Sequence, residues 1–72
     1  MLYRGTIKRY PDGQESLAIH EFCGNGVFDI VSVGTSDLCA MDLNNKARSK
    51  FWDARHKCTV KKPTVFYYHE YR

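Results

Sequence analysis

The first half of the chain alternates between apolar and polar residues, which is the pattern of β-strands that bury one face. Residues 2–10 and 15–23 both alternate in this way, and Tyr10-Pro11-Asp12-Gly13 lies between them. Proline presets φ for a turn, and glycine accepts the left-handed conformation that closes a short hairpin loop. We therefore expect an antiparallel hairpin. Its buried face should carry Tyr3, Gly5, Ile7, Leu17 and Ile19.

A third strand is predicted over residues 27–33, after the turn Gly24-Asn25-Gly26. Apolar side chains occupy both of its faces, because Phe28 and Ile30 alternate with valines. This composition is typical of a strand in the middle of a sheet or of one covered by a helix. The three strands together predict an antiparallel meander in which the third strand is central or covered.

From Asp42 onward the apolar period changes from that of a strand to that of a helix. Apolar residues are spaced four, four, three and four apart, which predicts an amphipathic helix. These residues are Leu43, Ala47, Phe51, Ala54 and Cys58. Asp42 is the expected N-cap, and the helix should end near Lys57, ahead of Pro63. Residues 34–41 fit two interpretations, a short fourth strand or the first turn of a helix that starts at Ser36.

A last strand is predicted over residues 64–71, which are dense in β-branched and aromatic side chains. The segment Lys61-Lys62-Pro63 should form an exposed linker in front of it. The predicted fold class is α+β, a three-stranded antiparallel meander with one amphipathic helix packed on it and a C-terminal strand. The element order is β-β-β-α-β, and the helix covers one face of the sheet.

The size of the chain limits the functions that it can carry. The 72 residues predict a single small domain, residues 1–72, and such a domain buries only about 60% of the surface that its unfolded chain exposes. Most apolar residues are then needed for the core, and little is left to line a deep active site. The sequence also lacks a carboxylate pair, a P-loop and a dinucleotide-binding motif. We expect no enzyme, no catalytic residue and no cofactor.

The cysteines and the termini bear on where the protein works. There are three cysteines, an odd number, and Met1 leads directly into a strand pattern without a signal peptide. No apolar run approaches the roughly 20 residues that a membrane helix requires. We expect free thiols in a reducing cytoplasm and no membrane partner.

A candidate binding surface lies on the predicted helix. Arg48, Trp52 and Arg55 stand at positions i, i+4 and i+7, in a line beside the buried stripe. Tryptophan and arginine are the residue types most enriched among interface hot spots. The competing interpretation is that Trp52 belongs to the edge of the core and that the arginine stems pack over it.

Basic residues surround this line and add Lys61 and Lys62 to the candidate site. The net charge of +3 is mild, but the positive residues concentrate in the second half of the chain. Such a field would steer an acidic protein surface or a phosphate backbone toward the helix. An ordinary solvated helix face is the favoured explanation of the same lysines. The residues concerned are Lys46, Lys50, Lys57, Lys61 and Lys62.

The last strand offers a further surface. The alternate set Val65, Tyr67, His69 and Tyr71 is expected to face outward. Outward aromatic side chains on a sheet can stack single-stranded bases. They also stabilise a small sheet through cross-strand pairs, and an edge strand can pair with a partner strand. The structural interpretation is favoured.

Metal binding and thiol chemistry are weaker candidates. His20 and Cys23 lie three positions apart and His56 and Cys58 two apart, whereas Cys39 stands alone. No Cys-x-x-Cys or His-x3-His pair is present, and residues three apart on a strand point to opposite faces. Nothing in the local sequence activates a cysteine as a nucleophile. We assign no metal ligand, and a zinc-stabilised interaction module is only a second alternative.

The hairpin resembles that of short uncharacterised bacterial and phage proteins. The residues that carry the resemblance are Tyr3, Ile7, Tyr10-Pro11-Asp12-Gly13 and Ala18-Ile19-His20-Glu21-Phe22, with Lys62-Pro63-Thr64-Val65 in the place of a Lys-Pro-Val segment. The match covers the hairpin, and the rest of the chain only by the order of elements. No catalytic residue is implied by it, and this helix is more basic than the helix of that family.

In size and in its lack of catalytic motifs, the chain is similar to small phage-encoded modulators of host enzymes such as RNA polymerase. This similarity favours a protein-binding module that inhibits or regulates a host enzyme by steric binding. The contact would be Arg48, Trp52 and Arg55, or an edge strand, and the chain would be a monomer or a weak homodimer. The alternative is a weak nucleic-acid-binding protein that uses the basic helix with Lys61 and Lys62.

Overall fold

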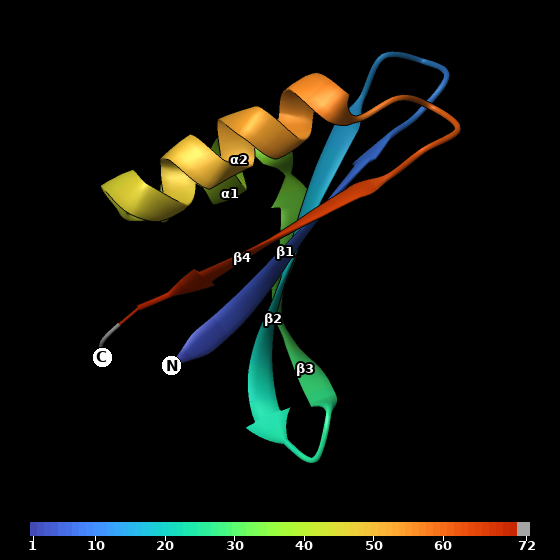
Figure 1. Cartoon of the computed structure of the whole chain (residues 1–72). Coiled ribbons are helices and arrows are strands. Elements are labelled where there is room, and N and C mark those ends of the chain that lie inside the picture. The colour runs from blue at the N-terminus through green and yellow to red at the C-terminus, as the bar shows by residue number, and fades with distance from the viewer. Residues whose placement is uncertain (71–72) are drawn as a thin grey trace.

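The computed structural model describes residues 1–70, which form a four-stranded antiparallel sheet and two helices (Figure 1). The strand order across the sheet is β3-β2-β1-β4, so that β4 returns to lie beside β1. The α+β class is confirmed, with the order β-β-β-α-α-β. The elements are β1 Leu2–Arg9, β2 Glu15–Gly24, β3 Val27–Thr35, α1 Ser36–Ala40, α2 Asn45–Lys57 and β4 Thr64–His69.

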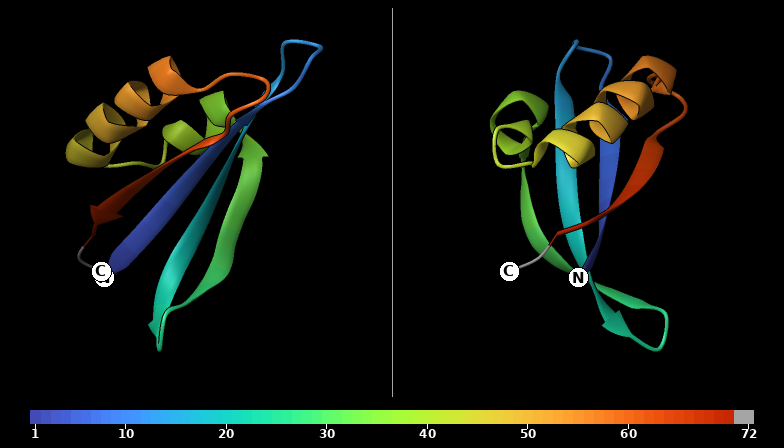
Figure 2. Two further views of the ribbon diagram at one scale, coloured as in Figure 1. Left: turned by 45° about the vertical axis from the view of Figure 1, so that its right-hand side comes forward. Right: turned by 60° about the vertical axis from the view of Figure 1, so that its left-hand side comes forward.

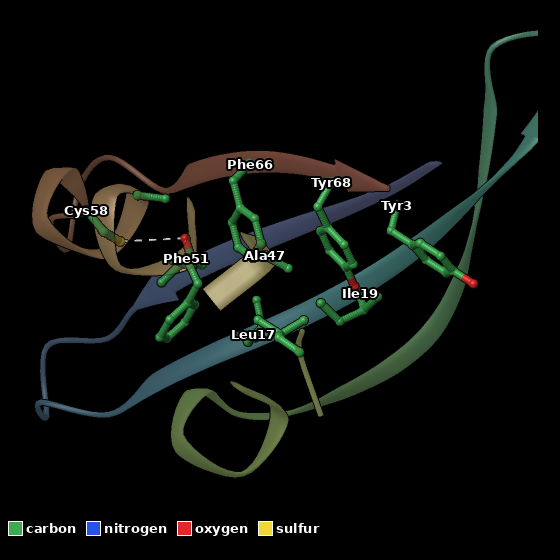
Figure 3. Close-up of a cluster of buried hydrophobic side chains, with 11 residues drawn as sticks. Tyr3, Leu17, Ile19, Ala47, Phe51, Cys58, Phe66 and Tyr68 are labelled. Atoms are coloured by element: carbon green, nitrogen blue, oxygen red, sulfur yellow. Dashed lines mark hydrogen bonds between the residues drawn. The ribbon is translucent and has the colours of Figure 1, made fainter. Parts of the chain in front are cut away.

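Both helices lie on the same side of the sheet (Figure 2). The core forms between them and the inward strand faces, where Phe51 of α2 packs on Phe66 of β4 and belongs to one buried cluster with Ile7 and Leu17; Figure 3 shows Phe51, Phe66 and Leu17 in it. The predicted helix stripe and the predicted hairpin face are buried throughout. They comprise Tyr3, Gly5, Ile7, Leu17, Ile19, Leu43, Ala47, Phe51, Ala54 and Cys58. The opposite side of the sheet, which we call the open face, is covered by no helix within residues 1–70.

Gly5 shows why β1 needs a glycine in the middle of a central strand. Gly5 and Phe66 are cross-strand partners, and the Phe66 ring lies over the glycine. A Cβ atom at position 5 would stand 2.2 Å from Cζ of that ring. Phe66 is buried and packs edge to face on Phe51, at 6.1 Å between ring centroids, so the ring has no space to retreat.

The two hairpin turns match their sequence signals. Gly13 has φ of 90°, and the N–H of Tyr10 donates to the carbonyl of Gln14 at 2.8 Å to close the first loop. Gly24, Asn25 and Gly26 all have positive φ, at 95°, 54° and 74°. The predicted turns are therefore confirmed, and they fix the register of the first three strands.

The prediction that the third strand is central or covered is wrong. β3 is an edge strand that pairs only with β2, and both Ile30 and Val33 are exposed, at 63% and 60%. The inner strands are β2 and β1, and β4 forms the other edge beside β1, because α2 crosses the sheet and delivers the chain to the β1 side. An apolar strand therefore ends up at an uncovered edge, which is unusual for a stable isolated sheet.

The predicted N-cap at Asp42 is also wrong. Residues 36–40 form the helix α1, which confirms the helical interpretation of that segment and excludes the strand. The amides of Asp42 and Leu43 donate back to the carbonyls of Cys39 and Ala40, so this stretch closes α1. The cap of α2 is Asn44, whose side chain accepts from the N–H of Ala47 at 2.8 Å. α2 ends at Lys57 as predicted, and the last part of the strand predicted to reach Tyr71 lies outside the described residues.

Candidate binding surfaces

Trp52 is half exposed on α2, with 47% of its surface accessible. Its ring meets the buried Phe51 edge to face, at 5.5 Å between centroids, and the Arg55 guanidinium lies 4.9 Å above its centre. One side of the indole is thus anchored to the core, whereas the other side faces solvent. The interpretation of Trp52 as an edge of the core with an arginine packed over it is therefore confirmed, and its role in binding stays a prediction.

Arg55 of α2 is paired with Glu15, which lies on the helix-facing side of β2. Its Nε donates to Glu15 Oε1 at 2.9 Å and its Nη2 to Oε2 at 3.2 Å, and Arg9 adds a third contact at 3.4 Å. The hydrogen bond from Arg55 is the main reason that the pKa of Glu15 is lowered, and the same bond raises the pKa of Arg55. The paired guanidinium of Arg55 is thus held in place over the indole of Trp52.

Arg48 is tied to the loop between the helices. Its Nη2 donates to the carbonyl of Leu43 at 3.0 Å and to that of Met41 at 3.4 Å. Arg48 and Trp52 border one cleft of about 410 Å³ together with Asp37, Ala40, Met41 and Phe51. The structure thus brings Arg48, Trp52 and Arg55 onto one flank of α2, as predicted.

Two residues that the sequence did not single out complete this surface. Leu38 of α1 and Met41, which follows it, are exposed at 69% and 72%. Met41 borders the same cleft as Trp52, and we call these two apolar side chains, with the exposed Leu38 three residues before Met41 in the chain, the Trp52 patch. The sequence shows an apolar run here, Leu38-Cys39-Ala40-Met41. Four residues are too few to reveal a helical period, so they do not show which side chains a helix would expose to solvent.

Lys61 and Lys62 lie apart from the Trp52 patch. They belong to the exposed loop after α2, where Thr59 and Lys62 exchange backbone hydrogen bonds at 3.1 and 3.2 Å. Arg48 lies in the first turns of the same helix. The two lysines therefore lie at the far end of α2 from Arg48.

The remaining lysines of α2 line its other flank, beside β4. Lys46 and Lys50 border a groove of about 820 Å³ with Tyr68, His69 and Glu70. Lys50 Nζ donates to the carbonyl of Tyr67 at 3.0 Å. Because β4 is an edge strand of the described sheet, this carbonyl has no neighbouring strand to pair with on its outer side. The basic residues are thus divided between two flanks of the helix rather than gathered around Trp52.

The cysteines are free thiols in three different surroundings. Cys58 is buried in the core, with its Sγ 3.5 Å from the carbonyl of Ile7. A hydrogen bond with Asp29 raises the pKa of Cys23, and burial raises the pKa of Cys39. A raised pKa leaves less thiolate, which disfavours nucleophilic chemistry at both positions. Within residues 1–70, no three histidine, cysteine or carboxylate side chains are grouped closely enough to hold a metal ion.

Comparison of the chain with models of protein families, with curated proteins and with solved structures finds no match. Neither helix of the described chain combines the length and the apolar character needed to cross a membrane.

Proposed function

We propose that the chain is a small protein-binding module that acts by occupying the surface of another protein. The observation that carries this proposal is the Trp52 patch, where Phe51 and Arg55 hold a half-exposed indole on the cleft that the exposed Met41 also borders. An indole that is already ordered loses little conformational entropy on binding, and tryptophan is the residue most typical of interface hot spots.

The surroundings of the patch favour a protein rather than a nucleic acid as its partner. The cleft beside Trp52 carries Asp37 as well as Arg48, and Arg48 is bound to backbone carbonyls. A mixed-charge rim around exposed apolar side chains is typical of protein interfaces. The net charge of +3, with Lys61 and Lys62 in an exposed loop, would steer an acidic protein toward the chain.

Two likenesses support the narrower part of the proposal: the hairpin resembles that of uncharacterised bacterial and phage proteins, and the small size without catalytic motifs is similar to phage-encoded modulators of host enzymes. We place the chain among inhibitors or regulators encoded by phages or mobile elements, which act on a host enzyme such as RNA polymerase in the host cytoplasm. Steric binding requires no catalytic group, and a domain of this size can cover one functional surface of a large enzyme.

The test captures partners from a bacterial lysate on the immobilised chain and compares variants by quantitative mass spectrometry. Met41→Asp places a charge in the patch at an exposed position and should leave the fold intact. Trp52→Ala removes the indole. Tyr67→Ala, on the open face of the sheet, is the matched control.

We expect a protein that the wild type and Tyr67→Ala retain and that both patch variants lose. With that protein purified, Trp52→Ala should weaken binding by about 30-fold, since a central hot spot contributes about 2 kcal/mol or more. Trp52 is the only tryptophan, so its emission reports the contact directly. Capture that is unchanged in Met41→Asp and Trp52→Ala would show that the patch is not the interface.

A further inference from the structure

The open face of the sheet carries side chains whose chemistry the Trp52 patch does not use. Ile30, His20, Arg4 and Tyr67 are successive cross-strand partners, so they form one row across all four strands. Their side chains point away from the helices, because the alternate residues of each strand form the core. The outward direction predicted for Val65, Tyr67 and His69 is confirmed, and Tyr71 lies outside the described residues.

Arg4 lies at the centre of this row and has no anionic partner among residues 1–70. Neither ion pair of that part of the chain involves Arg4, and its buried Nε has no hydrogen bond. Nδ1 of His20, on the neighbouring strand, is also buried and unbonded. Buried polar atoms in native proteins are almost always satisfied, so these two atoms leave an unmet hydrogen-bonding capacity beneath the centre of the open face.

The charge that the four strands place on the open face is of one sign. Glu15, Glu21 and Asp29, the carboxylates within the four strands, all lie on the alternate positions that face the helix side. Arg4 and Lys8 remain on the open face. A sheet surface that combines arginine and lysine with no strand carboxylate is complementary to an anion.

The guanidinium of Arg4 lies over one ring of a small aromatic cluster on the open face. Its centre lies 4.7 Å above the ring of Phe28, and Phe28 in turn lies 5.2 Å from Phe22 and 6.3 Å from Tyr67. Phe22 and Tyr67 remain exposed, at 37% and 47%. Rings that flank a guanidinium on a flat sheet give unpaired bases a surface to stack on, while the arginine binds a phosphate.

We infer that the open face binds single-stranded nucleic acid, with a phosphate at Arg4 and bases stacked on Tyr67 and Phe22. Bases in a duplex are stacked on one another and hidden from such rings, so single strands are favoured. An acidic peptide would satisfy Arg4 but would leave the aromatic rings without matching partners. This site is separate from the Trp52 patch and does not depend on it.

Fluorescence anisotropy with labelled oligo(U) and oligo(dT) of about 12 nucleotides tests the inference. Two phosphates bound by Arg4 and Lys8 predict a salt slope of about −1.4, which is about 25-fold weaker binding at about 200 mM than at about 20 mM salt. Tyr67→Ala should weaken binding about 10-fold, and Tyr67→Phe should retain it, because only the ring is required. Arg4→Gln should reduce the salt slope by about 0.7.

Two controls distinguish binding on the open face from binding on α2 and from binding of a duplex. Trp52→Ala should bind oligonucleotides as the wild type does, and a duplex of matched length should bind at least about 10-fold more weakly. Tyr67→Leu keeps an apolar side chain without a ring, so it tests stacking if Tyr67→Ala fails to fold. The inference is overturned by no binding at low salt, by equal binding of duplex, by wild-type affinity in Tyr67→Leu, or by binding of oligo-glutamate in place of both oligonucleotides.

Discussion

Glu15 connects the N-terminal hairpin to the helix α2, because it accepts hydrogen bonds from Arg55 of α2 and from Arg9 of β1. Its side chain is only 11% exposed, so these bonds are shielded from solvent. The arrangement also sets the place of Trp52, since Arg55 lies over the indole. The carboxylate of Glu15 thus holds Arg55 in the position from which its guanidinium covers the ring of Trp52.

Glu15 predicts a pH dependence of stability. Its pKa in the folded protein is below its ordinary value of 4.5, mainly because of the hydrogen bond from Arg55, so the stabilisation is complete above that value and is lost as the pH falls through the lowered pKa. Urea unfolding of the wild type and of Glu15→Gln at neutral pH and near pH 3 should show a difference of about 1 kcal/mol that shrinks in acid. A difference that is constant with pH would show that the ionised carboxylate contributes nothing.

The caps of α2 show how far local sequence signals reach. The helix stripe from Leu43 to Cys58 is readable in the sequence because its period follows from α-helical geometry alone. The start of the helix is not readable, since Asp42 and Asn44 are both good N-caps and lie two residues apart. Which of the two residues caps α2 depends on where α1 ends. The carbonyls of Cys39 and Ala40 accept hydrogen bonds from the amides of Asp42 and Leu43, so Asp42 belongs to the end of α1.

Two substitutions distinguish these candidate caps. Asn44→Ala removes the acceptor of the Ala47 amide and should lower the free energy of unfolding by about 1 kcal/mol. Asp42→Ala should change it by less than about 0.5 kcal/mol, because Asn44 and not Asp42 caps α2. Thermal or urea unfolding measures the free energy of unfolding of both variants. A larger loss of stability in Asp42→Ala than in Asn44→Ala would show that Asp42 is the cap.

The strands show a different limit of sequence interpretation. Alternation predicts the faces of β1, β2 and β4 correctly, since the side-chain period of two is a local property of any strand. The place of a strand in the sheet is not local. The apolar composition of β3 predicts a covered strand, but α2 carries the chain across the sheet to β1 and leaves β3 at the edge. The open-face row of Arg4, His20 and Tyr67 depends on this strand order, and no spacing in the sequence reveals it.

At the scale of the whole molecule, the sheet separates two surfaces of different chemistry. The Trp52 patch is apolar with a mixed-charge rim, whereas the open face combines Arg4 and Lys8 with aromatic rings. Trp52 contacts Phe51 and Arg55, and Tyr67 contacts Phe28, so these ring and cation contacts have no residue in common. A chain with both surfaces could hold a protein and a single-stranded nucleic acid at the same time.

This separation predicts that substitutions on the two surfaces act independently. Sites without shared contacts usually have additive effects on stability, so the free-energy changes of Trp52→Ala and Tyr67→Ala should sum in the double variant to within about 0.5 kcal/mol. Urea unfolding of the wild type, both single variants and the double variant completes the cycle. As a matched comparison, Trp52→Ala with Glu15→Gln should be non-additive, because Glu15 holds the arginine that covers the indole. Coupling between Trp52 and Tyr67 that is as large as in this comparison pair would mean that the core transmits changes between the faces, and that one ligand would alter the affinity for the other.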